Sequence, residues 1–365
     1  MSLSPKNKYY LKRILPFGVI WLLFGMLFLW VEYAALGNQY NTPDSAIQLS
    51  SDVLTFALIG ISLIGLLVGC IEVFLLDRLF ENKPLGVKLI SKFLIYALFF
   101  EGVISITFPM AASIELDTSF FDTRVWDKYV VFFFSITHLS AVVQLSFSLL
   151  ASLFYSEMSQ HMGQHVLLNF FTGKYHKPVV EARIFMFVDM KDSTTIAEKL
   201  GHKAYFKLLR SYYAEFSEAI IKNQGQVYQY VGDEIVITWP LDQGLKNNRC
   251  VQCFYDMQND LSKKESTYLK KYKLAPSFKA ALHYGKVTTG EIGALKKDIF
   301  FTGDVLNTTA RILGLTSTFK EDVLISTALS RKLNLTQKYT LTPLGAPPLK
   351  GKTDAVEIAA IHKVS

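Results

Sequence analysis

Two different hydrophobic patterns divide the chain near Tyr155. The first part contains four long apolar segments separated by polar stretches, at residues 14–35, 53–76, 89–112 and 129–154. At a rise of about 1.5 Å per residue, each segment is long enough to cross a hydrocarbon core of roughly 30 Å as a helix. The pattern therefore predicts an all-α transmembrane domain of four helices over residues 1–155.

The charges that flank these segments predict their orientation. Basic residues precede the first segment and surround the second loop: Lys6, Lys8, Lys12, Arg13, Arg78, Lys83, Lys88 and Lys92. The first loop, residues 36–52, has no Lys or Arg, and the third loop is mainly acidic. Because cytoplasmic loops carry an excess of Lys and Arg, both termini are expected in the cytoplasm of a multi-pass (inner) cell-membrane protein. A cleaved signal peptide is the alternative, but the first apolar core is longer than such peptides have.

Two ionisable residues, Glu101 and His138, fall near the middle of the third and fourth segments. Such groups must be paired or solvated inside a membrane, so we expect them to face each other. A structural hydrogen bond is the favoured role, and a sensing role is the alternative. Glu72 is nearer the inner end and is expected to reach the interface. Gly65 and Gly69 form a GxxxG pair that lets two helices approach closely.

Residues 156–181 are polar and mixed, and we interpret them as a linker. Apolar residues at near-helical spacing predict a short amphipathic helix, which Gly173 and Pro178 end. This helix either transmits dimer geometry from the membrane or is only a tether. The linker also contains three histidines, interpreted as surface residues because no nearby carboxylate or Cys completes a metal site: His161, His165 and His176.

Residues 182–365 show short apolar runs alternating with amphipathic stretches. Strands are expected at residues 182–190, 277–284, 286–293, 298–302 and 322–326, with a hairpin around Asp233, closing strands, and helices at 194–200, 202–223 and 246–264. Paired strands with helices on one face predict an α+β domain built on an antiparallel sheet.

Two carboxylates in this part suggest metal chemistry. Asp189 ends the apolar strand of residues 182–190, and Asp233 follows Gly232 in a tight turn between two strands. Carboxylates on strand ends, beside backbone carbonyls, suit a hard cation such as Mg²⁺. The ordinary alternative is that Asp189 caps a helix and Asp233 fills a turn.

A third stretch favours the metal interpretation. The sequence KAALHYGKVTTGEIG, residues 279–293, leads into TGDVLNTTARI, residues 302–312. Asn307 and Arg311 are four residues apart in the second stretch, so they share one helical face.

These motifs together resemble a known family. The order FVDMKDST, YVGDE, H-x-G-x-V-x-x-G-x-I-G, G-D-V-x-N-x-x-A-R and a final LKGK is similar to the catalytic domain of class III nucleotidyl cyclases, from about Ala182 onward. The resemblance implies a ferredoxin-like fold, a nucleoside triphosphate substrate and an active site formed between two copies in a homodimer.

The resemblance also assigns roles to residues. Asp189 and Asp233, with the backbone carbonyl of Met190, would hold two Mg²⁺ or Mn²⁺ ions per active site. Asn307 would position the ribose and Arg311 would stabilise charge on the α-phosphate, both from the opposite protomer. Further substrate contacts are expected from Thr194, Gly232 and either Lys350 or Lys352.

Two positions depart from the family pattern. Gln229 stands where a purine-reading Lys is usual, and Phe300 stands where adenylate cyclases usually have Asp or Thr. Gln both donates and accepts hydrogen bonds, whereas Phe only stacks or fills space, so base selection differs in detail. ATP is the first choice, and GTP or a pyrimidine triphosphate stays open. A non-catalytic nucleotide-binding or dimerisation module is the alternative function.

Composition changes this picture little. The chain has 365 residues and a net charge of +7, but the basic residues are dispersed or flank apolar segments, so nucleic-acid binding is not expected. Its 3 cysteines give no disulfide framework. Cys250 and Cys253 lie within a predicted helix, where burial is favoured over metal binding.

Overall fold

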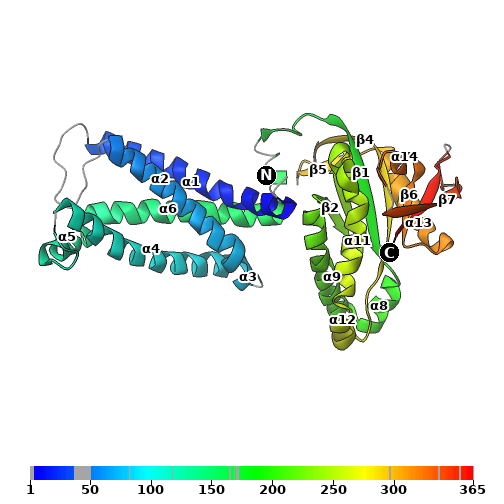
Figure 1. Cartoon of the computed structure of the whole chain (residues 1–365), viewed down its shortest axis with the longest axis horizontal. Coiled ribbons are helices and arrows are strands. Elements are labelled where there is room, and N and C mark those ends of the chain that lie inside the picture. The colour runs from blue at the N-terminus through cyan, green and yellow to red at the C-terminus, as the bar shows by residue number, and fades with distance from the viewer. Residues whose placement is uncertain are drawn as a thin grey trace. The chain divides into compact units, whose positions relative to one another are not determined.

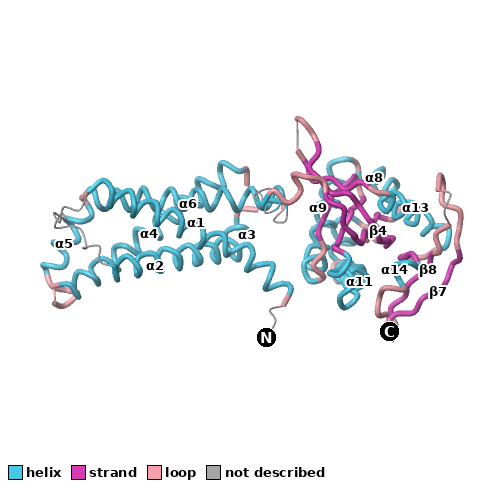
Figure 2. Tube along the Cα trace, turned by 90° about the horizontal axis from the view of Figure 1, so that it is seen from above, coloured by secondary structure: helices cyan, strands magenta, loops and turns pink. Residues whose placement is uncertain are grey.

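The computed structural model describes residues 4–36, 51–81, 83–116, 118–163, 166–167, 169, 172–295, 297–335, 338–352 and 355–364. The chain forms two compact units, of which the N-terminal unit is Asn7–Leu167 and the C-terminal unit is Leu168–Ser365 with Met1–Lys6. Figure 1 labels the elements, and Figure 2 shows that the strands gather in the C-terminal unit.

The N-terminal unit is a bundle of long helices. Its elements are α1 (Pro5–Leu36), α2 (Ser51–Ile71), the π-helix η1 (Glu72–Leu76), α3 (Asp77–Leu79), α4 (Leu85–Glu115), α5 (Thr123–Phe133) and α6 (Ile136–Met162). Within the described residues, 4 helical stretches are long and apolar enough to cross a membrane: Pro5–Val31, Leu58–Leu79, Leu85–Met110 and Ile136–Met162. Most of the predicted first loop lies outside the described residues.

The prediction of one continuous fourth segment over residues 129–154 is wrong. The helix breaks between α5 and α6, because the side chain of Ser135 accepts a hydrogen bond from the His138 N–H at 3.2 Å and caps a new helix. The spanning helix α6 then continues past Tyr155 and ends at Gly163, which has φ +86°. The predicted domain boundary after Tyr155 therefore falls inside a helix.

The linker is only partly described. His161 and His176 are exposed, as expected, while His165 lies outside the described residues. Parts of the predicted amphipathic helix also lie outside the described residues. Within the C-terminal unit, the Tyr175 carbonyl accepts a hydrogen bond from the Glu291 N–H at 3.1 Å, so this part of the predicted linker is attached to a strand.

Gly65 and Gly69 allow α1 and α2 to pack closely. A Cβ atom on Gly65 would lie 2.7 Å from the side chain of Trp21, and one on Gly69 would lie 3.1 Å from Phe17. Trp21 and Phe17 are both fully buried. The small residues therefore admit two large aromatic side chains of α1, as the GxxxG spacing suggests.

A group of buried and partly buried charges joins five helical elements of the N-terminal unit: α1, η1, α3, α4 and α6. The Lys92 ammonium group contacts Glu72 and lies 3.2 Å from Asp77 and 3.3 Å from Glu157. Glu72 is fully buried, so the expectation that it reaches the interface is wrong: the π-turn at Glu72–Leu76 places it against Lys92 instead. We call this group the ion cluster; it consists of Arg13, Glu72, Asp77, Lys88, Lys92 and Glu157.

Glu101 and His138 do face each other. His138 Nε2 lies 3.5 Å from Glu101 Oε2, and His138 Nδ1 lies 2.8 Å from the carbonyl oxygen of Phe133. The ring of Phe133 stacks on His138 with centroids 5.0 Å apart. This pair therefore joins α4 to the break between α5 and α6.

The C-terminal unit is a single mixed sheet with helices. Its elements are β1 (Val179–Met190), α8 (Ser193–Leu200), α9 (His202–Lys222), β2 (Gln226–Val231), β3 (Glu234–Pro240), α10 (Leu241–Leu245), η2 (Lys246–Asn248), α11 (Arg249–Ser262), α12 (Glu265–Tyr272), β4 (Phe278–Ile292), β5 (Asp298–Thr302), α13 (Asp304–Phe319), β6 (Val323–Ser326), α14 (Thr327–Ser330), β7 (Tyr339–Gly345) and β8 (Ile358–Lys363). The strand order is β2-β3-β1-β4-β6-β8-β7, with β5 paired to β4.

The sequence places most of these elements correctly, but the short helices α10, α12 and α14 were not predicted, and other elements differ in detail. β4 is one strand rather than two, and its pairing with β6 is parallel. The predicted helix at residues 246–264 begins at Arg249, because Asn247 and Asn248 adopt positive φ. Cys250 and Cys253 are fully buried in α11, as predicted.

Helices cover both faces of the sheet, so the prediction of helices on one face is wrong. Ile184, Met186 and Val188 of β1 lie in the core with α9 and α11, whereas Phe185 and Phe187 lie in the core with α13. Figure 1 shows the sheet between these two layers. An apolar run without alternation is typical of a strand buried on both sides.

Candidate active site

The two predicted metal ligands lie at one end of the sheet. Asp189, near the end of β1, pairs with Glu234 of β3 on one side and with Lys279 of β4 on the other. Asp233 occupies the turn between β2 and β3, next to Gly232, whose φ of +62° favours glycine. The hairpin therefore brings the second carboxylate to the end of the strand that carries the first.

Three carboxylates lie close together at this end of the sheet: Asp189, Asp233 and Glu234. The pKa of Asp189 is raised by burial and by a hydrogen bond and the charge of Asp233, although Lys279 Nζ lies 3.3 Å from Asp189 Oδ2 and opposes the shift. Burial and the charges of the two aspartates raise the pKa of Glu234 to about 7. A divalent cation bound to oxygen ligands would relieve this repulsion, so the residues present fit Mg²⁺ or Mn²⁺.

Met190 can contribute only its backbone. Its side chain is 2% exposed and packs in the core, which leaves the carbonyl oxygen as the available ligand. We call Asp189, Met190 and Asp233 the acidic half-site. Thr194 lies close in sequence, exposed in the first turn of α8.

Tyr213 of α9 supports the acidic half-site and was not identified from the sequence. Its hydroxyl group donates a hydrogen bond to the Gly232 carbonyl at 3.0 Å, and its ring contacts Tyr230 with centroids 4.7 Å apart. Nothing in the local pattern distinguishes it from the other aromatic residues of α9, because the contact depends on how the helix packs beside the hairpin.

The second group of predicted residues lies on α13. Asn307 is exposed and Arg311 is half-buried, and within the described residues neither side chain makes a hydrogen bond or ion pair. Two glycines let α13 approach the sheet: a Cβ on Gly303 would lie 2.8 Å from the Lys286 carbonyl oxygen, and one on Gly285 would lie 3.0 Å from Val305. The glycine spacing thus serves helix packing, and it leaves Asn307 and Arg311 facing outward.

The structure distinguishes the two candidate lysines of the LKGK segment. Lys352 Nζ lies 2.5 Å from Asp304 Oδ2 and 2.8 Å from Thr308 Oγ1, so it fastens the segment to α13. The Lys352 ammonium group lowers the pKa of Asp304. Lys350 is exposed instead. We call Asn307, Arg311 and Lys350 the α13 half-site.

The strands that carry Gln229 and Phe300 also come together. Gln229 is exposed on β2, and Phe300 on β5 is 45% exposed. Their neighbours Tyr228 and Phe301 are in ring contact with centroids 4.8 Å apart. The contact brings β2 and β5 together, although they are distant in sequence.

Within one chain, Asn307 is placed away from the acidic half-site along α13. Lys279, beside Asp189, lines a cavity of about 310 Å³ together with Thr316 near the end of α13. Asn307 precedes Thr316 by nine residues, which is about 14 Å along a helix axis, and it lies on an exposed face. Asn307 is therefore accessible on a surface of α13 away from that cavity.

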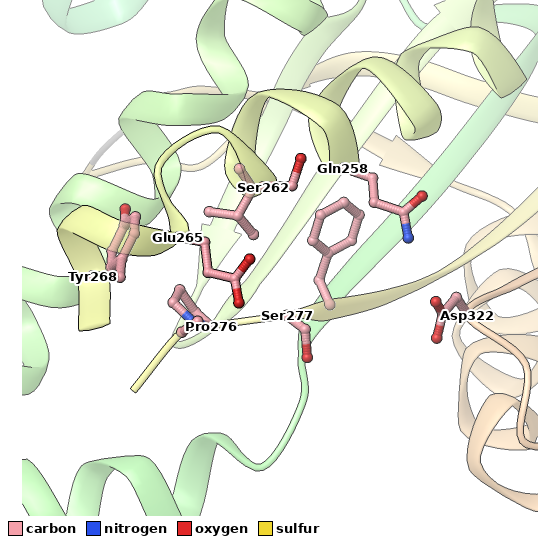
Figure 3. Close-up of a pocket in the computed structure, with 10 residues that line it drawn as sticks. Gln258, Ser262, Glu265, Tyr268, Pro276, Ser277 and Asp322 are labelled. Atoms are coloured by element: carbon pink, nitrogen blue, oxygen red, sulfur yellow. The ribbon is translucent and has the colours of Figure 1, made fainter. Parts of the chain in front are cut away.

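A further cavity of about 270 Å³ lies between α11, α12 and the start of β4. Figure 3 shows Gln258, Glu265, Ser277 and Asp322 around it. No predicted site residue lines this cavity.

Comparison with known proteins gives the family. Residues 175–362 match the model of the adenylate and guanylate cyclase catalytic domain, and the chain belongs to this family. Its C-terminal unit is thus a class III cyclase domain, and the predicted α+β fold class, preceded by a helical domain with four apolar helices, is confirmed.

Named relatives agree with this family. The chain is 34% identical over 209 residues to "Adenylate cyclase 2" of Rhizobium meliloti (strain 1021), which is 57% of this chain and 58% of that protein. It is 28% identical over 180 residues to "Adenylate cyclase" of Anabaena cylindrica, which is 47% of this chain and 35% of that protein. A solved bacterial light-regulated adenylyl cyclase has the same fold, with a TM-score of 0.51 and 22% identity over 60% of this chain and 64% of that one. The chain thus spans less than two thirds of each of these proteins.

Proposed function

We propose that this protein is a membrane-bound nucleotidyl cyclase that converts ATP to 3′,5′-cyclic AMP and pyrophosphate at a homodimer interface. In this reaction the ribose 3′-oxygen bonds to the α-phosphorus, the bond to the bridging oxygen breaks, and the hydroxyl proton is released. The observation that carries the proposal is that Asn307 is exposed on α13, away from the cavity beside Asp189, as expected if the two groups of residues act on different protomers. Two antiparallel copies would supply both halves twice.

The acidic half-site would hold two divalent cations. Asp189, Asp233 and the Met190 carbonyl are the oxygen ligands, and Lys279 must give up its contact with Asp189 when an ion is bound. When bound, such ions lower the pKa of the 3′-hydroxyl group and neutralise the triphosphate. Tyr213 would hold the turn that carries Asp233.

The α13 half-site of the opposite protomer would complete the reaction geometry. Asn307 would orient the ribose, and the Arg311 guanidinium group would stabilise charge developing on the α-phosphate. Lys350 would reach the distal phosphates, because Lys352 is already neutralised by Asp304. Among the described residues, the side chains of Asn307, Arg311 and Lys350 make no hydrogen bond or ion pair that would compete with substrate binding.

The four apolar helices would anchor the enzyme in the cell membrane. With both termini in the cytoplasm, as the basic residues favour, the C-terminal unit would have access to nucleoside triphosphates. The linker and the end of α6 would join the membrane anchor to the dimeric catalytic part.

ATP is the preferred substrate in this proposal because the relatives at 34% and 28% identity are named adenylate cyclases. Gln229 and Phe300 would line the base pocket in place of the usual pair. GTP and pyrimidine triphosphates are therefore the alternatives to test.

The test is to incubate the purified full chain in lipid nanodiscs with each of the four nucleoside triphosphates and Mn²⁺, and to identify the products by mass. A cyclic nucleotide from ATP supports the proposal, and a different cyclic nucleotide corrects the base. If a nucleotide binds but no cyclic product forms, the protein is a non-catalytic nucleotide-binding module instead. The double substitution Gln229→Lys and Phe300→Asp should then favour ATP more sharply, since hydrogen-bonding sites discriminate by up to about 10⁴–10⁵-fold.

A further inference from the structure

Arg183 is a charged side chain that the proposed chemistry does not use, yet it is only 2% exposed. It lies in the middle of β1, away from the acidic half-site at the end of that strand. Removing a guanidinium group from water is costly unless its hydrogen bonds are satisfied. Its surroundings therefore need an explanation.

The guanidinium group binds three different strands. Its Nε donates to Thr238 Oγ1 of β3 at 3.0 Å, its Nη1 donates to Glu181 Oε1 of β1 at 3.1 Å, and its Nη2 donates to Gln226 Oε1 of β2 at 2.6 Å. The rigid, planar fork of Arg fixes these partners relative to one another in a way that a Lys ammonium group cannot.

The same guanidinium group also holds β5. It lies over the ring of Phe301, 4.8 Å from the centroid, and Phe301 in turn contacts the ring of Tyr228. The Phe301 N–H donates to the Tyr228 hydroxyl oxygen at 3.4 Å. β5 pairs with β4 and lies off the main strand order, so these side chains, and not a ladder of backbone hydrogen bonds, connect it to β2.

Both ends of this connection adjoin the expected base pocket. Phe300 precedes Phe301 on β5, and Gln229 follows Tyr228 on β2. We propose that Arg183 is a positioning residue for base selection, which sets the spacing between Gln229 and Phe300 by holding Phe301 and Gln226. The inference rests on the proposed cyclase function and extends it to a residue that does not touch the substrate.

Glu181 extends the connection toward the linker. Its carboxylate accepts hydrogen bonds from the Tyr175 hydroxyl at 3.2 Å and from Thr289 Oγ1 at 2.8 Å as well as from Arg183. The residue that neutralises Arg183 is therefore itself held by the segment that precedes β1 and by β4.

The test compares substrate selectivity in full-length variants in nanodiscs. Arg183→Met keeps much of the volume but removes the fork, and Arg183→Lys keeps the charge. Arg331→Met is the matched control, because the Arg331 side chain is 73% exposed and pairs with Glu357 at the surface. The quantity measured is the ratio of kcat/KM values among the four triphosphates, together with thermal unfolding.

We expect Arg183→Met to change the preference for the best substrate over the next by about tenfold or more, since pocket geometry of this kind controls discrimination of 10–200-fold. Arg183→Lys should lie between this variant and the parent. Arg331→Met should leave the ratio within about twofold, because surface substitutions have small effects.

Loss of folding must be distinguished from loss of positioning. Arg183→Met leaves Glu181 without its cation, so the double variant Glu181→Gln with Arg183→Met removes both charges together. Phe301→Leu keeps Arg183 and its hydrogen bonds but breaks the contact with Tyr228. Both should move the selectivity ratio in the same direction as Arg183→Met.

Equal loss of rate for all four substrates, with an unchanged ratio in the folded variants, would overturn the positioning role. If Gln229→Ala and Phe300→Ala move the ratio while the Arg183 and Phe301 variants do not, the base pocket stands and this inference fails. If the parent makes no cyclic nucleotide, the proposed function fails, and the ratio of dissociation constants for the four nucleotides replaces kcat/KM in the same comparison.

Discussion

The ion cluster of the N-terminal unit and the acidic half-site of the C-terminal unit both gather carboxylates around a lysine, but they satisfy them differently. In the ion cluster, Lys92 contacts three carboxylates, and Lys92 and Glu72 are at most 1% exposed. In the acidic half-site, the pKa of Asp189 is raised by burial and by the neighbouring carboxylate of Asp233 despite Lys279, and the Asp189 side chain is 26% exposed. Charges that are neutralised inside the protein hold helices together, whereas partly neutralised and accessible charges are suited to a ligand.

The largest expected effect is on turnover. Asp189→Asn or Asp233→Asn should lower kcat by about 10³-fold or more, because each removes a carboxylate that would bind metal, a loss comparable to that of a major transition-state group. Thermal stability should be unchanged or higher, since the substitution removes repulsion. Product formation at saturating Mn²⁺ and the unfolding temperature are measured together. Turnover within threefold of the parent in either variant would contradict the assignment of Asp189 and Asp233 as metal ligands.

In the ion cluster, a substitution is expected to lower stability rather than turnover. Lys92→Met should destabilise the N-terminal unit by about 3–5 kcal/mol, because it leaves buried carboxylates without their cation. Lys83→Met, at an exposed position, is the matched control and should change stability by about 0.5 kcal/mol or less. Unfolding in detergent is followed for both. Equal stability of the two variants would mean that the buried charges are solvated rather than paired.

Mixing two inactive variants tests whether the α13 half-site of one protomer completes the acidic half-site of its partner. Asp189→Ala and Arg311→Ala chains should each be inactive alone. Random mixing should restore about a quarter of the parent activity, because half of the dimers are mixed and each has one intact site of two. Activity is measured after demonstrating mixed dimers with two affinity tags. No recovery in such dimers would place the whole site within one chain.

The smallest effect concerns His283, a partly buried histidine of the cyclase motif that the folded protein keeps neutral. Burial and the charge of Lys352 lower the pKa of His283 to about 4, and its Nδ1 lies 2.8 Å from Ser326 Oγ. The unfolded chain therefore binds a proton that the folded chain excludes, so stability is full above about pH 6.5 and falls as pH decreases to 4. The loss is about 3 kcal/mol at most. Denaturation of His283→Asn should show less decline between pH 7 and pH 5, and an identical decline in both proteins would contradict this origin.

Much of the molecule follows from local pattern. The long apolar segments predict the helices, because a span must satisfy its backbone hydrogen bonds internally and present an apolar surface. The five ordered motifs of residues 182–365 predict the cyclase fold, and the strand at Asp298–Thr302 has the predicted bounds. Gly65 and Gly69 indicate close packing, since only small residues admit Trp21 and Phe17 there.

The sequence by itself determined most of the elements and which residues carry the candidate chemistry, including Asp189, Asp233, Asn307 and Arg311. Only the tertiary structure decided which charges are partnered. It placed Glu72 against Lys92 through a π-turn, fastened Lys352 to Asp304 while leaving Lys350 exposed, and joined β2 to β5 through Arg183 and Phe301. Periodicity depends on neighbours three or four residues apart, whereas an ion pair depends on residues brought together across 20 or 48 positions of the chain.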